Sequence, residues 1–300
     1  MALADMFSDL LVLITSKKSL NPPDDDHNYG HYRYENAVGL FLGLLFIGFF
    51  LYNLVIEPVY AFVFRKPIYV HFYFFPKKLT LRQLSVLHRQ FDFYKKLSIR
   101  EKQYFEHRVA KFIEKYPFHG REGLEITDEI KILIAATSTM LTFGMRTYLF
   151  EVIDKVIVFP DAYYSQASDA YHNGEFNPRL RAIVFSWKHF KQGYEISNDN
   201  LNLGLHEFSH VLHFQGLKKN DTSATLFSAA YDEIIEQIKR PSNYKRLIDS
   251  EYFRIYAYTN QFEFIAVILE HFFETPKQFK SEFPELFESV KTMINFKELI

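Results

Sequence analysis

The residues best suited to chemistry lie in the run from Leu205 to His213. His206 and His210 are four residues apart, so on a helix both side chains project from one face, one turn apart, where a single tetrahedral metal ion can take both. Glu207 lies one step round the helix and is placed to act as a general base rather than as a ligand. This is the HExxH pattern of zinc hydrolases. The alternative is a pair of helix-face histidines that form hydrogen bonds in a core.

A third metal ligand is needed to separate these two interpretations. His213 lies on roughly the same face as His206 but about 10 Å along the helix axis, which makes joint coordination poor. Residues 262–274 form a second apolar helical stretch, on which Glu263 and Glu270 are seven residues apart and share a face. Two histidines and one glutamate are a known catalytic zinc set. Spacing alone does not choose between Glu263 and Glu270.

The composition limits the class of protein. The chain has 300 residues, a net charge of −1 and no cysteine. A chain without cysteine has neither disulfides nor thiolate ligands, so a metal site must use histidine, carboxylate and water. The near-neutral charge gives no indication of nucleic-acid binding. The 33 phenylalanines and 20 tyrosines are expected mainly in the core and at interfaces.

One stretch is long and apolar enough to cross a bilayer. Residues 37–56 carry no charged side chain, and twenty helical residues cover about 30 Å, the thickness of the hydrocarbon layer. We therefore predict an N-terminal polar segment (residues 1–36), a single transmembrane helix (37–56), a juxtamembrane connector (57–76) and a soluble domain (77–300). Within twenty residues of the span, the basic residues are Lys17, Lys18 and Arg33 before it and Arg65 and Lys66 after it. Lys77, Lys78, Arg82 and Arg89 follow slightly further on, and with them we expect a cytoplasmic position for this domain.

The elements that would position the site follow from capping and periodicity. Helices are predicted from Thr80 to about Leu97, from the capping box of Ser98 and Glu101 to about 115, and over 128–143, 222–239, 261–274 and the C-terminus. Asn202 and Gly204 are expected to lead into the helix that carries His206 and His210, and Gly216 to end it. Strands are predicted at 156–159 and 181–186, with a polar loop over 163–178 between them. The expected fold class is α+β, mostly helical with a small sheet.

Several segments together resemble the MtfA-like zinc metallopeptidases. In the family's order they are "FHGREGLEITDEIKILIAA", "VIVFPDAYY", "AIVFSW", "NLGLHEFSH", "YAYTNQFEFIAV" and "HFFETP". The resemblance implies a zincin-like domain with His206, His210 and Glu263 as zinc ligands and Glu207 as the base. It also matches Tyr256 to a tyrosine that assists catalysis. His213 stands where the family usually has an aspartate, and the membrane segment has no counterpart in the family's soluble prototype.

We therefore expect a membrane-anchored, zinc-dependent peptidase that acts on a peptide or protein substrate. The alternative is a zinc-stabilised regulatory module that binds a partner at the membrane without catalysis. If Glu270 is not a ligand, it is a candidate for orienting a histidine ligand. The other interpretation is that Glu270 is a structural carboxylate paired with a cation. The sequence indicates no particular regulatory partner, substrate or oligomeric state.

Overall fold

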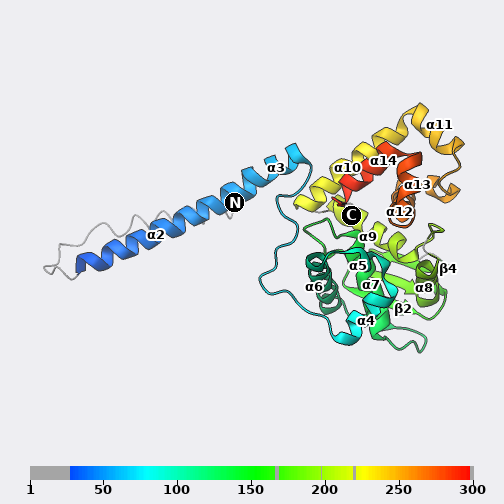
Figure 1. Ribbon diagram of the computed structural model, residues 1–300, viewed down its shortest axis with the longest axis horizontal. Coiled ribbons are helices and arrows are strands. Elements are labelled where there is room, and N and C mark those ends of the chain that lie inside the picture. The colour runs from blue at the N-terminus through cyan, green and yellow to red at the C-terminus, as the bar shows by residue number, and fades with distance from the viewer. Residues whose placement is uncertain (1–27, 166–168, 197, 219–220, 298–300) are drawn as a thin grey trace. The chain divides into compact units, whose positions relative to one another are not determined.

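The computed structural model describes residues 28–165, 169–196, 198–218 and 221–297. The chain forms two compact units, Met1–Ile56 and Glu57–Ile300 (Figure 1). In the first unit, α2 (Asn28–Leu51) continues into a short π-helix, Tyr52–Ile56. The helix thus begins before residue 37, so the part of the predicted polar segment over 28–36 is helical. Residues 1–27 lie outside the described residues.

The apolar helix is the one candidate membrane span in the described part of the chain. The stretch that is long and apolar enough runs from Ala37 to Phe64. No residue in its most apolar part is buried. This range contains the predicted span, residues 37–56, and extends into α3 (Glu57–Phe64) of the second unit. Glu57 is buried against that unit, where its carboxylate pairs with Arg146.

The second unit is mostly helical. After α3 its helices are α4 (Leu81–Gln90), α5 (Asp92–Lys96), α6 (Ile99–Lys115), α7 (Asp128–Leu141), α8 (Trp187–Glu195), α9 (Leu203–Lys218), α10 (Thr222–Lys239), α11 (Pro241–Asp249), the 3-10 helix η2 (Ile255–Tyr258), α12 (Gln261–Glu274), α13 (Pro276–Glu282) and α14 (Pro284–Met293). Its strands are β1 (Phe118–Gly120), β2 (Lys155–Phe159), β3 (Tyr163–Ser165), β4 (Ala170–His172), β5 (Gly174–Asn177) and β6 (Ala182–Ser186). The α+β class with a small sheet is confirmed.

Local signals account for most helix starts. The side chain of Ser98 accepts from the backbone N–H of Glu101, which returns the bond in the predicted capping box. The single helix predicted from Thr80 to Leu97 was wrong, because the chain breaks at Phe91 between α4 and α5. Phe91 adopts an extended backbone and is fully buried, so burial of its ring accounts for the break. The short helices α8 and α11 were not predicted, and the C-terminal helix is two, α13 and α14.

Four strands form a mixed sheet in the order β1-β2-β6-β5. β1, β2 and β6 are parallel, and β5 runs antiparallel to β6 at the edge. The predicted strands appear as β2 and β6, but the predicted loop over 163–178 was wrong, since it contains β3, β4 and β5. The four residues of β5 have no strand pattern of their own and become a strand by pairing with β6.

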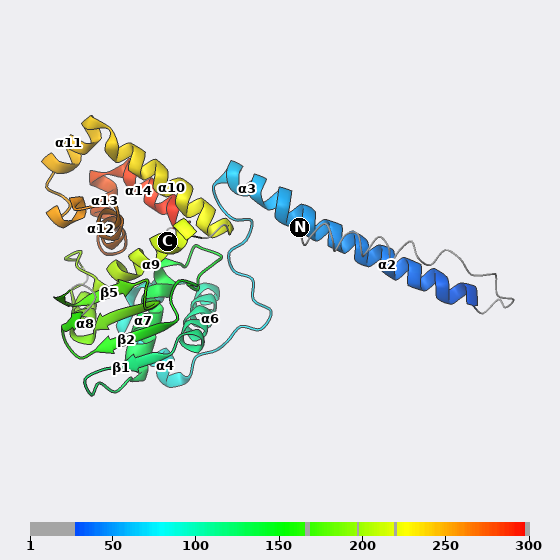
Figure 2. The same cartoon turned by 180° about the vertical axis from the view of Figure 1, so that it is seen from behind.

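The helix that carries the two histidines, α9, lies at the centre of this unit. It packs against β5 and β6 on one side and against α12 and α10 on the other (Figures 1 and 2). Phe208 on α9 is fully buried and contacts the rings of Phe112, Phe150 and Phe185. These aromatic contacts join α9 to the sheet and to α6. Much of the phenylalanine content thus serves the core, as the composition predicted.

Candidate metal centre

The two histidines of α9 meet at one point. Asn202 caps the helix, because its side-chain oxygen accepts from the backbone N–H of Leu205 at 3.0 Å and its own carbonyl accepts from His206 N–H at 2.9 Å. From this fixed start, the i,i+4 spacing brings the Nε2 atoms of His206 and His210 to 3.2 Å from each other. Both rings are largely buried. The spacing therefore produces the pair that the sequence predicted.

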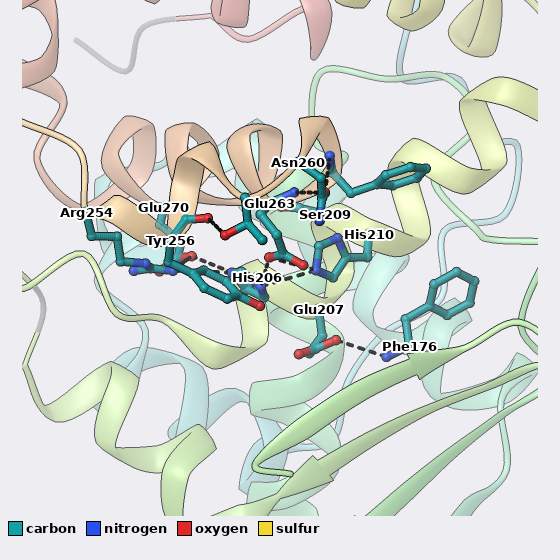
Figure 3. Close-up of polar contacts among 12 residues, drawn as sticks. Phe176, His206, Glu207, Ser209, His210, Arg254, Tyr256, Asn260, Glu263 and Glu270 are labelled. Carbon is teal, nitrogen blue, oxygen red and sulfur yellow. Dashed lines mark hydrogen bonds and ion pairs between the residues drawn. The ribbon is translucent and has the colours of Figure 1, made fainter. Parts of the chain in front are cut away.

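Glu263 approaches the same point from α12. Asn260 caps α12 by accepting from the backbone N–H groups of Phe262 and Glu263, which fixes the first turn on which Glu263 lies. Its Oε2 lies 3.0 Å from Nε2 of His206 and 3.6 Å from Nε2 of His210 (Figure 3). Among the described residues these three side chains form the group that could hold a metal ion.

The donor atoms fit a tetrahedral zinc ion. Bonds of 2.0–2.1 Å at tetrahedral angles place ligand atoms about 3.3 Å apart, and the three separations of 3.0, 3.2 and 3.6 Å lie around that value. Glu263 Oε2 is buried, and although it lies close to the two imidazoles, no described residue gives it a hydrogen bond of normal geometry. Three lone-pair atoms at this separation repel one another unless a cation or shared protons lie between them. Burial lowers the pKa of His206, but the carboxylates of Glu263 and Glu270 outweigh burial and raise the pKa to about 10.

Glu270 lies on the other side of the His206 ring. Its Oε1 is 2.7 Å from Nδ1 of His206, and the carboxylate is 1% exposed. When Nδ1 donates to Glu270, Nε2 keeps the lone pair that a metal needs. Spacing left Glu263 and Glu270 as equal candidates for the ligand. In the structure Glu263 faces both histidines, whereas Glu270 contacts only the rear nitrogen of one.

Arg254 completes this arrangement and was not predicted. Its two terminal nitrogens lie 2.7 and 3.1 Å from the two carboxylate oxygens of Glu270. The backbone N–H of Asn202 also donates to Glu270, at 3.1 Å, which ties the start of α9 to α12. A buried carboxylate on an apolar helix needs a cation, and that requirement was the available signal for an arginine. The sequence did not identify Arg254 as that cation, because Arg254 lies outside both helices and no spacing pattern links it to Glu270.

Glu207 lies against the edge strand rather than against the metal ligands. Its Oε2 accepts from the backbone N–H of Phe176 on β5 at 2.9 Å. The side chain is buried, and burial raises its pKa above the ordinary value. A raised pKa makes the carboxylate a better proton acceptor near neutral pH. Gly174, also on β5, has no side chain where Glu207 lies: a Cβ there would be 2.9 Å from Glu207 Cγ.

Tyr256 lies beside the ligand group and is half-exposed. It belongs to η2, and its ring centre is 5.9 Å from that of His206. Burial and the charge of Glu263 raise the pKa of the phenol to about 12, so the hydroxyl keeps its proton. Figure 3 shows the ring next to His206 and Glu263. The position allows the hydroxyl to donate to a molecule bound at the group.

His213 is separate from the ligand group. It is 1% exposed, and neither ring nitrogen has a hydrogen-bond partner in the described part of the chain. The ring packs between those of Tyr231 and Phe262, with centres 4.3 and 4.4 Å away. Burial, with the neighbouring charge of His210, lowers its pKa to about 4. His213 is therefore a neutral core residue.

Comparison with known proteins gives three findings. Residues 75–294 match the family described as glucose-regulated metallo-peptidase M90. Residues 1–74 match the cation efflux transmembrane domain. An uncharacterised protein of Synechocystis sp. is 25% identical over 248 residues, which cover 75% of this chain and 88% of that protein. The first match includes every site residue described above, and the second includes the apolar helix.

Proposed function

The chain belongs to the glucose-regulated metallopeptidase family, and from this we propose that it is a membrane-anchored zinc peptidase with Glu207 as its general base. The family match over residues 75–294 establishes a metallopeptidase, and the separate match of residues 1–74, with the candidate membrane helix, indicates a membrane-associated N-terminal region. Zinc as the metal, the ligand set and the mechanism are our proposal. The observation that carries it is the convergence of three ligand atoms at zinc-like separations.

His206, His210 and Glu263 would hold the zinc ion. When bound, zinc supplies Lewis acidity, which lowers the pKa of water from 15.7 towards about 7 and polarises carbonyl groups. Glu270 and Arg254 orient His206 by holding the proton of Nδ1 on the side away from the ligand group.

Glu207 and Tyr256 would carry the proton and charge transfers. Glu207 accepts a proton from the attacking water and returns it to the leaving amine, while the N–H of Phe176 holds its carboxylate in place. Tyr256 donates a hydrogen bond to the carbonyl oxygen that gains negative charge. Among the described strands, β5 lies at the edge of the sheet, so an extended peptide can add to the part of that edge that Glu207 does not use.

We also propose the arrangement across the membrane. Residues 37–56 form the span, residues 57–76 connect it, and residues 77–300 carry the peptidase activity on the cytoplasmic side. The basic residues Arg65, Lys66, Lys77 and Lys78 follow the span closely, which supports this orientation.

The test is the variant Glu207→Gln in the full-length protein. Because Glu207 is a base and not a ligand, the variant should keep one zinc ion per chain and lose 10²- to 10⁴-fold in peptidase rate. His210→Ala is the matched variant that should lose both zinc and activity. A non-catalytic, partner-binding module predicts that Glu207→Gln keeps full function in the cell, and that result would reject the proposal. In membranes, the inactive variant can also retain substrates for identification.

A further inference from the structure

The connector after the apolar helix exposes an unusual concentration of apolar side chains. Of the described residues after 56, nine exposed large apolar residues lie within 57–75, four of them at the end of the candidate span and five within 65–75, whereas thirteen are spread over 76–297. Phe62, Phe74 and Phe75 are 85%, 79% and 91% exposed. Single exposed apolar residues are normal, but a cluster marks an interaction site. We name residues 59–78 the docking segment; its exposed apolar residues are Val59, Phe62, Val63, Phe64, Ile68, Tyr69, Phe72, Phe74 and Phe75.

The rest of the second unit holds the backbone of this segment in place. Arg108 is completely buried and donates to the hydroxyl of Tyr73 at 2.6 Å and to the carbonyl of Val70 at 3.4 Å. Its remaining bonds go to backbone carbonyls near the end of α7. The guanidinium of Arg146 lies over the ring of Tyr69, 4.8 Å from its centre. The exposed rings are therefore displayed by a fixed backbone.

Side chains alternate between the two sides of the segment. His71 stacks on Tyr104 at 4.5 Å, and Tyr73 packs on His107 at 4.1 Å, so both face the unit. Phe72 and Phe74 lie between and after them and are exposed, with ring centres 4.8 Å apart. An extended chain places alternate residues on opposite sides. The phenylalanines thus form an outward face that no described residue covers.

Charge and position in the chain identify what this face contacts. No acidic residue lies between Glu57 and Asp92, while Arg65, Lys66, Lys77 and Lys78 flank the aromatic residues. Lys66 and Lys78 have no ion-pair partner in the part of the chain that the structure describes. The segment also follows directly after the apolar helix, where a chain leaving a bilayer must cross its interface. Phenylalanine rings on an amphipathic segment bury their apolar surface at that interface, and clustered lysines favour anionic headgroups.

We propose that residues 59–78 dock the peptidase unit onto the anionic surface of the membrane that residues 37–56 span. The rings of Phe72, Phe74 and Phe75 enter the lipid interface, and the flanking lysines face the headgroups. The connector then acts as a fixed contact rather than as a free tether, and it restrains the orientation of the unit at the membrane. This inference rests on the proposed membrane anchor but not on peptidase activity.

The absence of cysteine makes a direct test possible, because a single introduced cysteine carries the only label. Full-length Phe75→Cys and Ile255→Cys are labelled with an environment-sensitive fluorophore and placed in phosphatidylglycerol-containing vesicles. The two positions match in exposure, 91% and 89%. Lipids with a nitroxide near the headgroup serve as quenchers. We expect a blue-shifted, strongly quenched signal from position 75 and a water-like, weakly quenched signal from position 255.

The other outcomes overturn the proposal. Water-like emission at both positions means that the segment does not touch lipid. A blue shift at position 75 without lipid quenching means that protein, such as a second copy of the chain, covers the face. Equal quenching at both positions means that the contact is not specific to the segment. Vesicle flotation separates these results from failure of the anchor, since a protein that does not insert will not float.

A second arm tests the charges. Lys66→Gln with Lys78→Gln should reduce quenching at position 75 in anionic vesicles, and wild-type lysines in neutral phosphatidylcholine vesicles should give the same reduction. Quenching that is independent of both changes would remove the headgroup contact from the proposal. Unchanged zinc content and thermal melting show that each variant is folded.

Discussion

Replacing Gly174 by alanine tests how the base is held. In β5, a Cβ at this position would lie 2.9 Å from Cγ and 3.1 Å from Oε1 of Glu207. Ordinary contact begins near 3.4 Å, so the carboxylate must move by about 0.5 Å. The backbone of Gly174 does not have a positive φ, so alanine adds crowding without backbone strain. Glu207 is not a ligand, and the zinc content should stay at one per chain.

The magnitude follows from the displacement. A misplacement of about 1 Å can cost on the order of 100-fold in rate, so a shift of half that size should cost about tenfold, or ~1.4 kcal/mol in the barrier. The loss should be smaller than that of Glu207→Gln, which removes the base. The assay is kcat/KM on a peptide that the wild type cleaves, with zinc content measured on the same samples.

Leu203 supplies the control for packing. The same Cβ would lie 2.7 Å from Cδ1 of Leu203, and overpacking typically costs about 1–3 kcal/mol of stability. The double variant Gly174→Ala, Leu203→Ala relieves that contact and leaves the contact with Glu207. Thermal stability should recover in the double variant relative to Gly174→Ala, while activity should stay low. Two results would refute the reasoning. One is wild-type activity of Gly174→Ala. The other is a double variant that is as active as Leu203→Ala alone.

Three further predictions concern the ligands, the anchor and the tyrosine. Glu263→Ala should lose most of its zinc by metal analysis, whereas Glu270→Ala should weaken zinc binding by about 10- to 100-fold; the reverse order would exchange their roles. Full-length protein should resist extraction from membranes by carbonate, and deletion of residues 37–56 should abolish that resistance; release of the full-length protein would exclude the span. Tyr256→Phe should lower kcat by about 10²- to 10³-fold with little change in KM. The control Tyr258→Phe, which loses a hydroxyl bonded to a backbone carbonyl, should keep wild-type activity. Equal rates for wild type and Tyr256→Phe would remove Tyr256 from the mechanism.

The parts of the site that depend on helix periodicity were predictable from the sequence. The i,i+4 spacing brought His206 and His210 together because the segment is helical and its cap is local. Glu263 required the family resemblance, since two carboxylates on one helix face look alike until the partner helix is placed. In the structure the carboxylate of Glu263 lies beside both histidines, so Glu263 remains our proposed third ligand.

The parts that depend on tertiary pairing were not predictable. The strand that holds Glu207 has four residues, Gly174–Asn177, and reads as a polar loop because its strand conformation comes from β6. The bond to Glu207 comes from the backbone of Phe176, which any residue type except proline provides. Arg254 lies outside every motif with chemical meaning. Residue types therefore pointed to the proposed ligands but not to the groups that hold them in position.

The two carboxylates of α12 differ in how the protein neutralises them, and this difference supports their separate roles. Glu270 receives both terminal nitrogens of Arg254 and the N–H of Asn202, so its charge is matched within the protein. Glu263 is also largely buried, but among the described residues its charged partners are only the two imidazoles. The two imidazoles can bind a metal ion only as neutral rings with their lone pairs turned inward, and in that form they do not neutralise the carboxylate. A cation at that point satisfies Glu263 and both histidines at once, while Glu270 needs none. We therefore assign Glu263 to the metal and Glu270 to the orientation of His206.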